Sequence, residues 1–512
     1  MRFGLLLSAA AVAIASPAAA TWQQASSKHF VIYGDMPTAD MKAYATKLET
    51  FDAAARLIRA MPDPSLGDGN RLQVFLVSDL NAVGRLVGSN DYGIAGYFMG
   101  PVTGPVAVIP EKVRQKEAGY AKMTGENVFF HEYTHSLQLQ NTNKPLPQWL
   151  SEGFAEFMGS PMFNADGSIG IGAPPTYRAA ALFKGRQVPI GNLMSNKVDA
   201  YYDTMAFYTQ GWLMTHYLSL EPTRKGQIDR YVAAINKGTP PLDAARAAFG
   251  DLGDLEKTLL TYKRQKNLPY LKIDATKLTI QPVTVTEMSP GAQEVMQSRI
   301  RLKAALSDPD SQLLNRIRAV AKNYPADPIV LRTLAEAELR LKNYPEAVAA
   351  ADRAIAVDPK SVEPLVTKGE ALLEMAKKNR DAGTFKQARQ QFLAGNRLDK
   401  EDPQPLYLYY RTYIDEGVPV TEPARNAVHY AATLAPQDVE VQVRSSIQYI
   451  RDNKLAEAKD QIASLAFSPH KNKGQKLAKD VYDLLAANKR DEAVALAEKE
   501  LVEFTEDKKN KG

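Results

Sequence analysis

Two histidines four residues apart are the side chains best suited to chemistry in this chain of 512 residues. The segment His131-Glu132-Tyr133-Thr134-His135 places both imidazoles on one face of a predicted helix, with Cβ atoms roughly 5–6 Å apart. Both rings can therefore bind one metal ion. Glu132 lies about 100° further round the helix, so it is expected to reach a metal-bound water rather than the metal. The alternative is a surface helix that carries two histidines by chance, although the chain has only six histidines.

A glutamate on the next predicted helix supplies a third ligand. Segment 141–147 is rich in prolines and turn formers, so the first helix should end there. Apolar spacing at 149–157, with Ser151 as a possible cap, predicts a second helix that folds back and presents Glu152 to the two histidines. Two histidines and one glutamate are a known zinc ligand set that leaves a fourth position to water.

A second glutamate, Glu156, stands one turn beyond Glu152 on the same helical face. It is well placed to accept the free ring N–H of a ligating histidine, which would fix that ring's tautomer and orientation. For either glutamate alone, a solvated acidic face is an adequate explanation. Both glutamates are flanked by the aromatic residues Trp149, Phe154 and Phe157, so a solvated acidic face is a less suitable explanation for the two together.

The run from His131 to His135, followed by Trp-Leu-Ser-Glu-Gly-Phe-Ala at 149–155, resembles the gluzincin metallopeptidases, in particular their peptidase-MA-like branch. The resemblance implies that His131, His135 and Glu152 bind one zinc ion per chain. It also implies that Glu132 is the general base and that Glu156 supports a ligating histidine. The gap between His135 and Glu152 is shorter than in the best-known members, and many relatives carry Asp where Glu156 stands.

A zinc-bound hydroxide attacking a carbonyl group would require a second donor for the oxyanion. In the aminopeptidase relatives a tyrosine shortly before a glycine does this work, and Tyr208 before Gly211 is similar. Tyr202 is the reserve candidate. Packing of an amphipathic helix explains Tyr208 equally well and explains Tyr202 better.

The remaining histidines have no partner at ligand spacing, and the sequence predicts structural roles for them: His29, His216, His429 and His470.

The N-terminal segment indicates export. Arg2 precedes an apolar run from Phe3 to Ala15, and Ala18-Ala19-Ala20 resembles a signal-peptide cleavage site. The run is too short to span a membrane, and no later run of 18 apolar residues occurs. The chain has no cysteine, which excludes a disulfide framework. We expect a bacterial periplasmic or extracellular protein without a stable membrane span in its mature form.

Composition and pattern predict several domains. Hydrophobic residues make up 45% of the chain and the net charge is +5, values that are ordinary for globular proteins and do not favour a nucleic-acid partner. Residues 30–33, 72–77, 96–99 and 106–109 read as strands, and residues 38–59 as a helix. They form a small α/β lobe that leads into the histidine helix at about Glu126. Segment 219–270 reads as a helical lobe.

The C-terminal part contains repeats. Asn343-Tyr344-Pro345-Glu346-Ala347 followed by Asp358-Pro359 closely matches the second helix of a tetratricopeptide repeat, and degenerate copies follow with an insertion around residues 377–383. The predicted organisation is a signal peptide (1–20), an α+β metallopeptidase domain with an α/β and a helical lobe (21–270), an extended connector (271–295), an all-α tetratricopeptide-like solenoid (296–506) and a disordered tail (507–512).

These features together predict an exported zinc endopeptidase that acts on a polypeptide substrate. Its repeats would recruit substrate or a partner protein. An aminopeptidase is not supported, because the chain lacks the Gly-x-Met-Glu-Asn type of stretch that aminopeptidase relatives use. The alternative from another class is a protein-binding scaffold with a vestigial zinc site. Hydrolysis of a non-peptide amide is a minor third possibility.

Overall fold

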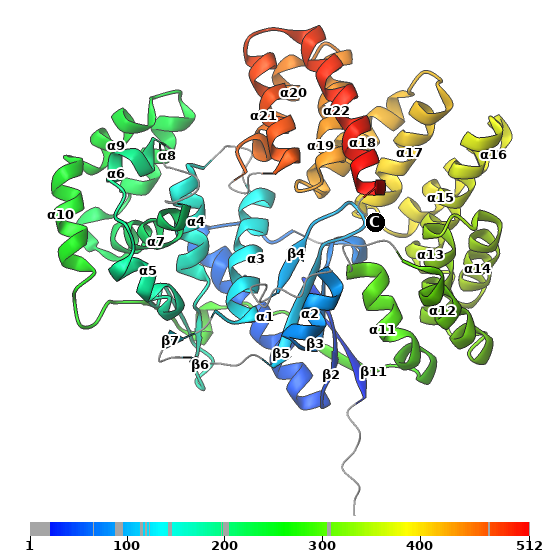
Figure 1. The fold of residues 1–512 in the computed structure, drawn as a ribbon, viewed down its shortest axis with the longest axis horizontal. Helices are drawn as coiled ribbons and strands as arrows, with labels where there is room; N and C mark the ends of the chain where they lie inside the picture. The colour runs from blue at the N-terminus through cyan, green and yellow to red at the C-terminus, as the bar shows by residue number, and fades with distance from the viewer. Residues whose placement is uncertain are drawn as a thin grey trace, which may run out of the picture.

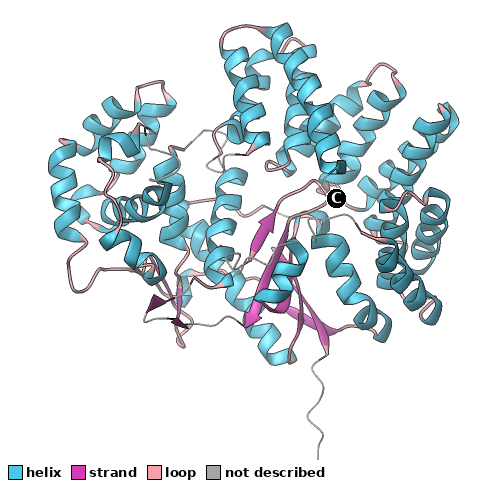
Figure 2. Ribbon diagram, viewed as in Figure 1, coloured by secondary structure: helices cyan, strands magenta, loops and turns pink. Residues whose placement is uncertain are grey.

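The computed structural model describes residues 21–510, with the exception of 65, 88–95, 113–115, 118–119, 122, 142–145, 196, 198–203, 305–308 and 469–471. The predicted signal peptide at 1–20 lies outside the described residues, as do Tyr202 and His470. The described chain consists of an α/β unit, a helical lobe and a curved array of helix pairs (Figures 1 and 2).

A six-stranded sheet forms the centre of the α/β unit. Strands β2, β3 and β5 run parallel, with Ile32 opposite Val74 and Val74 opposite Ala107, and the outer strands are antiparallel to their neighbours. In spatial order the strands are β11 (Thr284–Glu287), β1 (Trp22–Ser26), β2 (Phe30–Asp35), β3 (Leu72–Asp79), β5 (Val106–Lys112) and β4 (Tyr97–Met99).

Both faces of this sheet are buried, which explains its nearly continuous apolar strands. One face, with Ile32 and Val74, packs against α1 (Thr38–Arg59) and α3 (Gly125–Asn141). The other face, with Tyr33 and Phe75, packs against α2 (Leu80–Val87) and α11 (Pro290–Ala304). The sheet therefore connects the histidine helix α3 on one side to the first helix of the array on the other.

The helical lobe is built around the crossing of α4 (Gln148–Met158) and α7 (Thr204–Leu220). Its other helices are α5 (Ala179–Lys184), α6 (Ile190–Met194), α8 (Gln227–Asn236), α9 (Pro241–Phe249) and α10 (Leu252–Tyr262). A small sheet of β8 (Met162–Phe163), β9 (Ile169–Ile171) and β10 (Leu271–Ile273) borders the lobe, and β6 (Lys116–Glu117) pairs with β7 (Tyr120–Ala121).

The C-terminal array consists of consecutive antiparallel helix pairs that curve along one side of the molecule (Figure 1). The pairs are α11 with α12 (Ser311–Asn323), α13 (Pro328–Arg340) with α14 (Tyr344–Val357), α15 (Val362–Asn379) with α16 (Ala382–Leu398), α17 (Pro403–Glu416) with α18 (Glu422–Leu434), α19 (Val439–Arg451) with α20 (Leu455–Ala466), and α21 (Lys473–Ala486) with α22 (Arg490–Asn510). The insertion expected near residue 380 lengthens both helices of one pair: α15 has 18 residues and α16 has 17, against 13 and 14 in the preceding pair.

Helix α11 belongs to two cores at once. Its residues Ala292, Met296 and Ile300, spaced by one helical turn, pack against the sheet. Val295 and Leu302, on another face, pack with α12 and α13. The first helix of the array is therefore also a covering helix of the sheet.

Loops of the α/β unit also contact the array further along. The backbone N–H of Gly69 donates to Asp399 at 3.2 Å, and the amide of Asn70 donates to the carbonyl of Glu401 at 2.8 Å. The N–H of Val102 donates at 2.8 Å to Asp438, the carboxylate that also caps α19. These contacts hold the curved array against the unit from which it starts.

Several sequence expectations differ from the structure. Segment 271–295, expected as an extended connector that could form a strand or two, contains β10 and β11, which pair with β9 and β1, and the start of α11. Helix α22 continues to Asn510, so residues 507–510 are helical rather than a disordered tail. Strand β1 was missed because WQQAS contains no β-branched residue, and the side chains it buries are Gln23 and Ala25. No helix in the described part of the chain is long and apolar enough to cross a membrane.

We predict that Met296→Ala destabilises the whole protein by about 2–5 kcal/mol, because it opens a cavity between α11 and the sheet where Met296 is fully buried. Equilibrium urea unfolding measures this change. The matched control is Val357→Ala, since Val357 is 43% exposed and its truncation should change the free energy of unfolding by less than about 0.5 kcal/mol. Equal effects of the two substitutions would contradict the shared role of α11.

Candidate metal centre

One face of helix α3 packs against α1 and the sheet, and another face carries the two histidines. Phe130 packs against Phe51 of α1 with ring centroids 4.4 Å apart, and Tyr133 packs against Phe30 of β2 at 5.2 Å. Hydrophobic burial of these rings fixes the rotation of the helix about its axis. His131 and His135, one turn apart, are consequently directed away from the sheet and towards α4.

Helix α4 brings Glu152 to the histidines because two glycines allow it to cross α7 closely. A Cβ atom on Gly153 would lie 2.3 Å from the carbonyl oxygen of Gly211, and a Cβ atom on Gly211 would lie 2.6 Å from that of Trp149. Any larger residue at either position would push the helices apart. Glu152, next to this crossing, is almost completely buried with 1% of its surface exposed.

Three potential ligand atoms converge in the interior. Nε2 of His131 lies 3.2 Å from Nε2 of His135 and 3.2 Å from Oε2 of Glu152, and Nε2 of His135 lies 3.3 Å from the same oxygen. Tetrahedral coordination with bonds of about 2.0–2.1 Å separates neighbouring ligand atoms by about 3.3 Å. The three atoms thus have the spacing of three corners of a zinc tetrahedron, and these residues fit such an ion.

The charge state of Glu152 also suits a ligand. Burial raises the pKa of a carboxyl group, but the neighbouring His135 and His131 imidazoles outweigh this and hold the pKa of Glu152 well below its usual range. Glu152 is therefore an ionised carboxylate. Three acceptor atoms at these distances repel one another unless a proton or a metal ion lies between them.

The other ring nitrogen of His135 is fixed by neighbouring polar groups. Oε1 of Gln138 lies 3.2 Å from Nδ1 of His135 and accepts a hydrogen bond from the Ser151 hydroxyl at 3.1 Å. A proton on Nδ1 that bonds to this oxygen leaves Nε2 free to bind metal. Ser151 was expected to cap α4, but the helix begins at Gln148 and Ser151 lies within it, so its hydroxyl bonds to Gln138 instead.

Glu156 lies where the sequence placed it, but it has stronger partners than a histidine. Its Oε1 is 3.5 Å from Nδ1 of His131, longer than an ordinary hydrogen bond. The Arg178 guanidinium donates to the same oxygen at 2.7 and 3.1 Å, and the Tyr177 hydroxyl donates to Oε2 at 3.0 Å. Arg178 thereby neutralises Glu156 and holds it beside the ring of His131.

Glu132 and Tyr208 border the three ligands. The centre of the Tyr208 ring lies 5.8 Å from that of His131 and 4.8 Å from the Arg178 guanidinium. Burial, followed by the charges of Glu152 and Glu132, raises the pKa of the Tyr208 phenol, so it remains protonated and can donate a hydrogen bond. The structure thus brings Tyr208 and Glu132 to the site. Their catalytic roles stay predictions.

Sequence reasoning did not find Gln138, Tyr177 and Arg178. Gln138 could have been inferred, since it stands three residues after His135 on the same helical face. Tyr177 and Arg178 come from a turn after β9, and no spacing rule relates them to the histidines. His216 is a core residue as expected, since it is completely buried and its ring nitrogens contact the Tyr262 hydroxyl and the Pro269 carbonyl.

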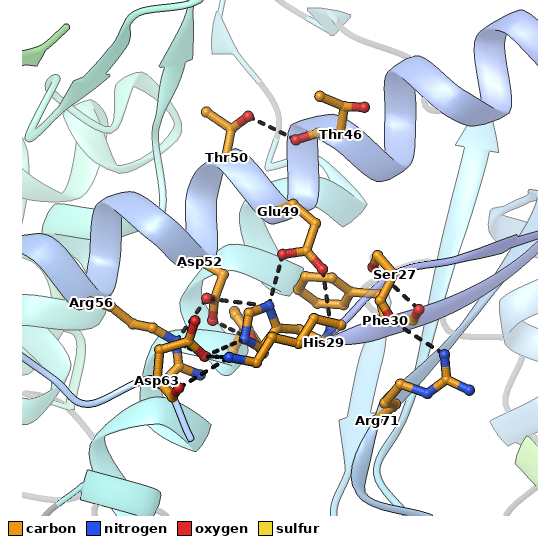
Figure 3. Close-up of polar contacts among 12 residues, drawn as sticks. Ser27, His29, Phe30, Thr46, Glu49, Thr50, Asp52, Arg56, Asp63 and Arg71 are labelled. Atoms are coloured by element: carbon orange, nitrogen blue, oxygen red, sulfur yellow. Dashed lines mark hydrogen bonds and ion pairs between the residues drawn. The ribbon is translucent and has the colours of Figure 1, made fainter. Parts of the chain in front are cut away.

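A second buried cluster surrounds His29, for which the sequence indicated no partner (Figure 3). Nδ1 of His29 lies 2.7 Å from Oε2 of Glu49 and 3.4 Å from Oδ2 of Asp52, and Nε2 lies 2.9 Å from Oδ1 of Asp63. Carboxylates at both ring nitrogens require both to carry protons, so the ring is an imidazolium. The sequence missed this cluster because its members are separated by 20 and 34 residues.

The His29 cluster contains its own cations. Arg56 donates to Asp52 at 2.7 Å, and Lys28 lies 2.5 Å from Asp63. The Tyr133 hydroxyl also donates to Asp52 at 2.7 Å, which connects the cluster to the histidine helix α3. With these partners the cluster is a charge-balanced brace between β2, α1 and α3.

Comparisons with known proteins returned no protein-family model and no curated protein that matches. The chain is similar to the MamA RS-1 ArsTM double mutant, with 20% identity and a TM-score of 0.27 over 35% of this chain and 93% of that one. It is similar to a thermophilic TPR protein of Thermus thermophilus, with 19% identity and a TM-score of 0.30 over 37% of this chain and 94% of that one. It is also similar to yeast Tom70, with 13% identity and a TM-score of 0.26 over 73% of this chain and 76% of that one. At TM-scores this low the likeness implies nothing further about this chain. The C-terminal array is tetratricopeptide-like by its own antiparallel helix pairs and sequence repeats.

The comparisons correct the predicted function. No family model and no curated protein matches, so no match supports a peptidase, and the solved structures named above are helical-repeat proteins. The prediction of a zinc endopeptidase whose repeats recruit substrate is therefore wrong on these findings. The alternative, a protein-binding scaffold, is the one with which they agree.

We predict that His29 makes stability depend on pH. Burial alone would lower the pKa of His29, but the hydrogen bonds to Glu49 and Asp63 and the charges of Asp52 and Glu49 raise it above the ordinary value of about 6.5. A raised pKa adds stability that is fully present below pH of about 6.5 and is lost as pH rises through the folded-state pKa. The difference in unfolding free energy between wild type and His29→Gln should therefore shrink with rising pH.

Urea unfolding between pH 5.5 and 9 provides this measurement. His429→Gln serves as the control, because burial lowers the pKa of His429 to about 4, so its contribution should not change above pH of about 6.5. A difference for His29→Gln that stays constant or grows with pH would show that the ring is neutral.

Proposed function

We propose that this chain is a protein-binding scaffold whose N-terminal part carries a zinc site. The observation that carries the scaffold function is a continuous row of charged and polar side chains along the first helices of consecutive pairs. We call the face formed by α11, α13, α15 and α17 the inner face. Stacked helix pairs bury one shared core and leave an extended curved surface of this kind for polypeptide segments.

The first half of the inner face is a network around Glu363 of α15. The carboxylate lies 3.2 Å from Arg299 and 2.9 Å from Lys303, both on α11, and 3.7 Å from Arg332 of α13. Lys303 also lies 2.8 Å from Glu336. Arg299 is buried beneath this network. A polypeptide on this face would meet the half-buried charges of Lys303, Arg332 and Glu363, held in fixed positions, which favours specificity over affinity.

The second half continues across α15 and α17. Gln404 donates to Glu370 at 2.9 Å, and Arg411 lies 3.1 Å from Asp415 and 3.1 Å from Glu440 of α19. Burial, only partly opposed by the Gln404 hydrogen bond, raises the pKa of Glu370 to about 7. At neutral pH this carboxyl group can therefore both donate and accept hydrogen bonds, as pairing with backbone amides requires.

The zinc site is proposed from the ligand geometry and supported by the motif. His131, His135 and Glu152 would hold the ion, and the resemblance of residues 131–155 to the gluzincin zinc segment favours the same set. When bound, an ion at this position supplies Lewis acidity and a fourth position for water. The three residues would join α3 to α4. Enzymatic activity of this centre, and export to the periplasm, stay predictions.

We predict that the purified protein contains about one zinc ion per chain and that His135→Ala abolishes this content. Bound zinc stabilises the folded state by about 3 kcal/mol at a free concentration of 100 times Kd, so a chelator should lower the Tm of wild type and leave that of His135→Ala unchanged. Elemental analysis and thermal unfolding provide the two measurements. His429→Ala, which removes a histidine far from the site, should retain zinc. Less than about half an ion per wild-type chain would contradict the site.

We predict that the double substitution Arg332→Ala with Lys377→Ala weakens peptide binding about tenfold, because both cations project from the inner face towards carboxylates of neighbouring helices. The measurement is fluorescence polarisation of labelled peptides that the wild-type full chain selects from a random library. The matched control is Arg353→Ala with Lys386→Ala, two exposed cations on α14 and α16. A loss of binding in the control that equals or exceeds that of the inner-face variant would place the binding surface elsewhere.

A further inference from the structure

A cavity of about 560 Å³ lies behind the metal centre. Leu150 and Phe154, one turn apart on α4, line it, whereas Glu152 between them projects from the opposite side of the helix. The cavity is therefore separate from the three ligand atoms. Its volume is in the range of small-molecule sites, about 300–1,000 Å³.

Most of the cavity wall is apolar and comes from four helices. Ile58 at the end of α1, Leu150, Phe154 and Phe157 of α4, Leu218 of α7 and Val232 of α8 contribute to it. Such a lining favours a hydrocarbon group, which gains about 25 cal/mol for each Å² that leaves water.

Two cations border the apolar wall. Arg59 and Lys225 line the cavity, and neither forms an ion pair within the described part of the chain. The Arg59 guanidinium lies over the Phe154 ring at 5.2 Å, which holds its charge against the wall. Asp229 is the one acidic residue among the described lining residues, so the charge at the cavity is positive.

Polar side chains also belong to the wall. Thr215 is completely buried, but its hydroxyl oxygen is closed off from the cavity and lies at the crossing of α4 and α7, where a Cβ atom on Gly153 would be 2.6 Å from it. Gln138 and Asn141 lie in the same wall.

We infer that this cavity binds a single-chain amphiphile with an apolar tail and an anionic head, of the class of medium-chain fatty acids. The tail lies against Leu150, Phe154 and Val232, and the carboxylate lies between Arg59 and Lys225. Opposite charge and apolar surface act together here: two unpaired cations beside hydrocarbon walls suit neither a neutral lipid nor a hydrophilic anion.

A ligand in the cavity would also affect the metal centre. Gln138 lines the cavity, and its amide oxygen faces Nδ1 of His135. Binding that shifts Gln138 changes the orientation of His135, so zinc and amphiphile influence each other's affinity by the same factor. This coupling rests on the proposed zinc site, whereas the cavity itself does not.

The test measures dodecanoate and 1-dodecanol binding to the zinc-depleted full chain by isothermal titration calorimetry. Dodecanoate should bind one per chain, and 1-dodecanol, which has the same tail without the charge, at least tenfold more weakly. Arg59→Gln with Lys225→Gln should weaken dodecanoate about tenfold and leave 1-dodecanol within twofold. Val232→Trp, which fills the cavity, should remove binding of both.

The charge-matched control is Arg230→Gln with Lys237→Gln, two exposed residues at α8 that do not line the cavity. It should bind dodecanoate as wild type does. Equal affinity for dodecanoate and 1-dodecanol, or equal weakening by the control pair, would overturn the anionic head group. Undiminished binding by a folded Val232→Trp variant would overturn the location. Repeating the titration with zinc tests the coupling separately, so failure of the zinc site leaves the cavity result intact.

Discussion

The close crossing of α4 and α7 at Gly153 and Gly211 is the constraint on which the N-terminal part depends. It places backbone against backbone, with space for no side chain at either glycine. Glu152, immediately before Gly153, is carried by this contact into the interior, where it meets the histidines of α3. Tyr208, three residues before Gly211 on α7, is carried next to His131, with ring centroids 5.8 Å apart. One backbone contact thus sets the position of a ligand and of a neighbouring phenol.

The array depends in the same way on a single helix. Because α11 covers the sheet with one face and packs on α12 and α13 with another, the array cannot rotate relative to the α/β unit without opening two cores. The loops that carry Gly69 and Val102 reinforce this by donating backbone N–H groups to carboxylates of the array. A partner on the inner face would therefore bind a preorganised surface, which lowers the entropic cost of association.

Local sequence patterns predicted much of this structure. Helix α1 was bounded correctly at Thr38 and Arg59, because its apolar period and flanking prolines are both local signals. The cluster of His131, His135 and Glu152 was predictable because one motif and one nearby helix hold its members, whereas metal binding by it stays a prediction. The pairing of β11 with β1 across more than 250 residues, and the Arg178–Glu156 contact, depend on long-range packing that no local pattern encodes. The array was recognisable from its repeats, but its attachment through α11 was not.

Electrostatics distinguishes the two buried clusters of histidine and carboxylate. Around His29, Arg56 and Lys28 stand within ion-pair distance of Asp52 and Asp63, so protein side chains balance the negative charge. Around His131 the nearest guanidinium, that of Arg178, is engaged by Glu156. Within the described residues Glu152 pairs with the two imidazoles alone. A buried carboxylate without Lys or Arg needs a cation from elsewhere, and two imidazoles that each offer Nε2 to the same point suit a metal ion better than a shared proton. Similar residue types therefore produce a brace in one place and a candidate metal site in the other.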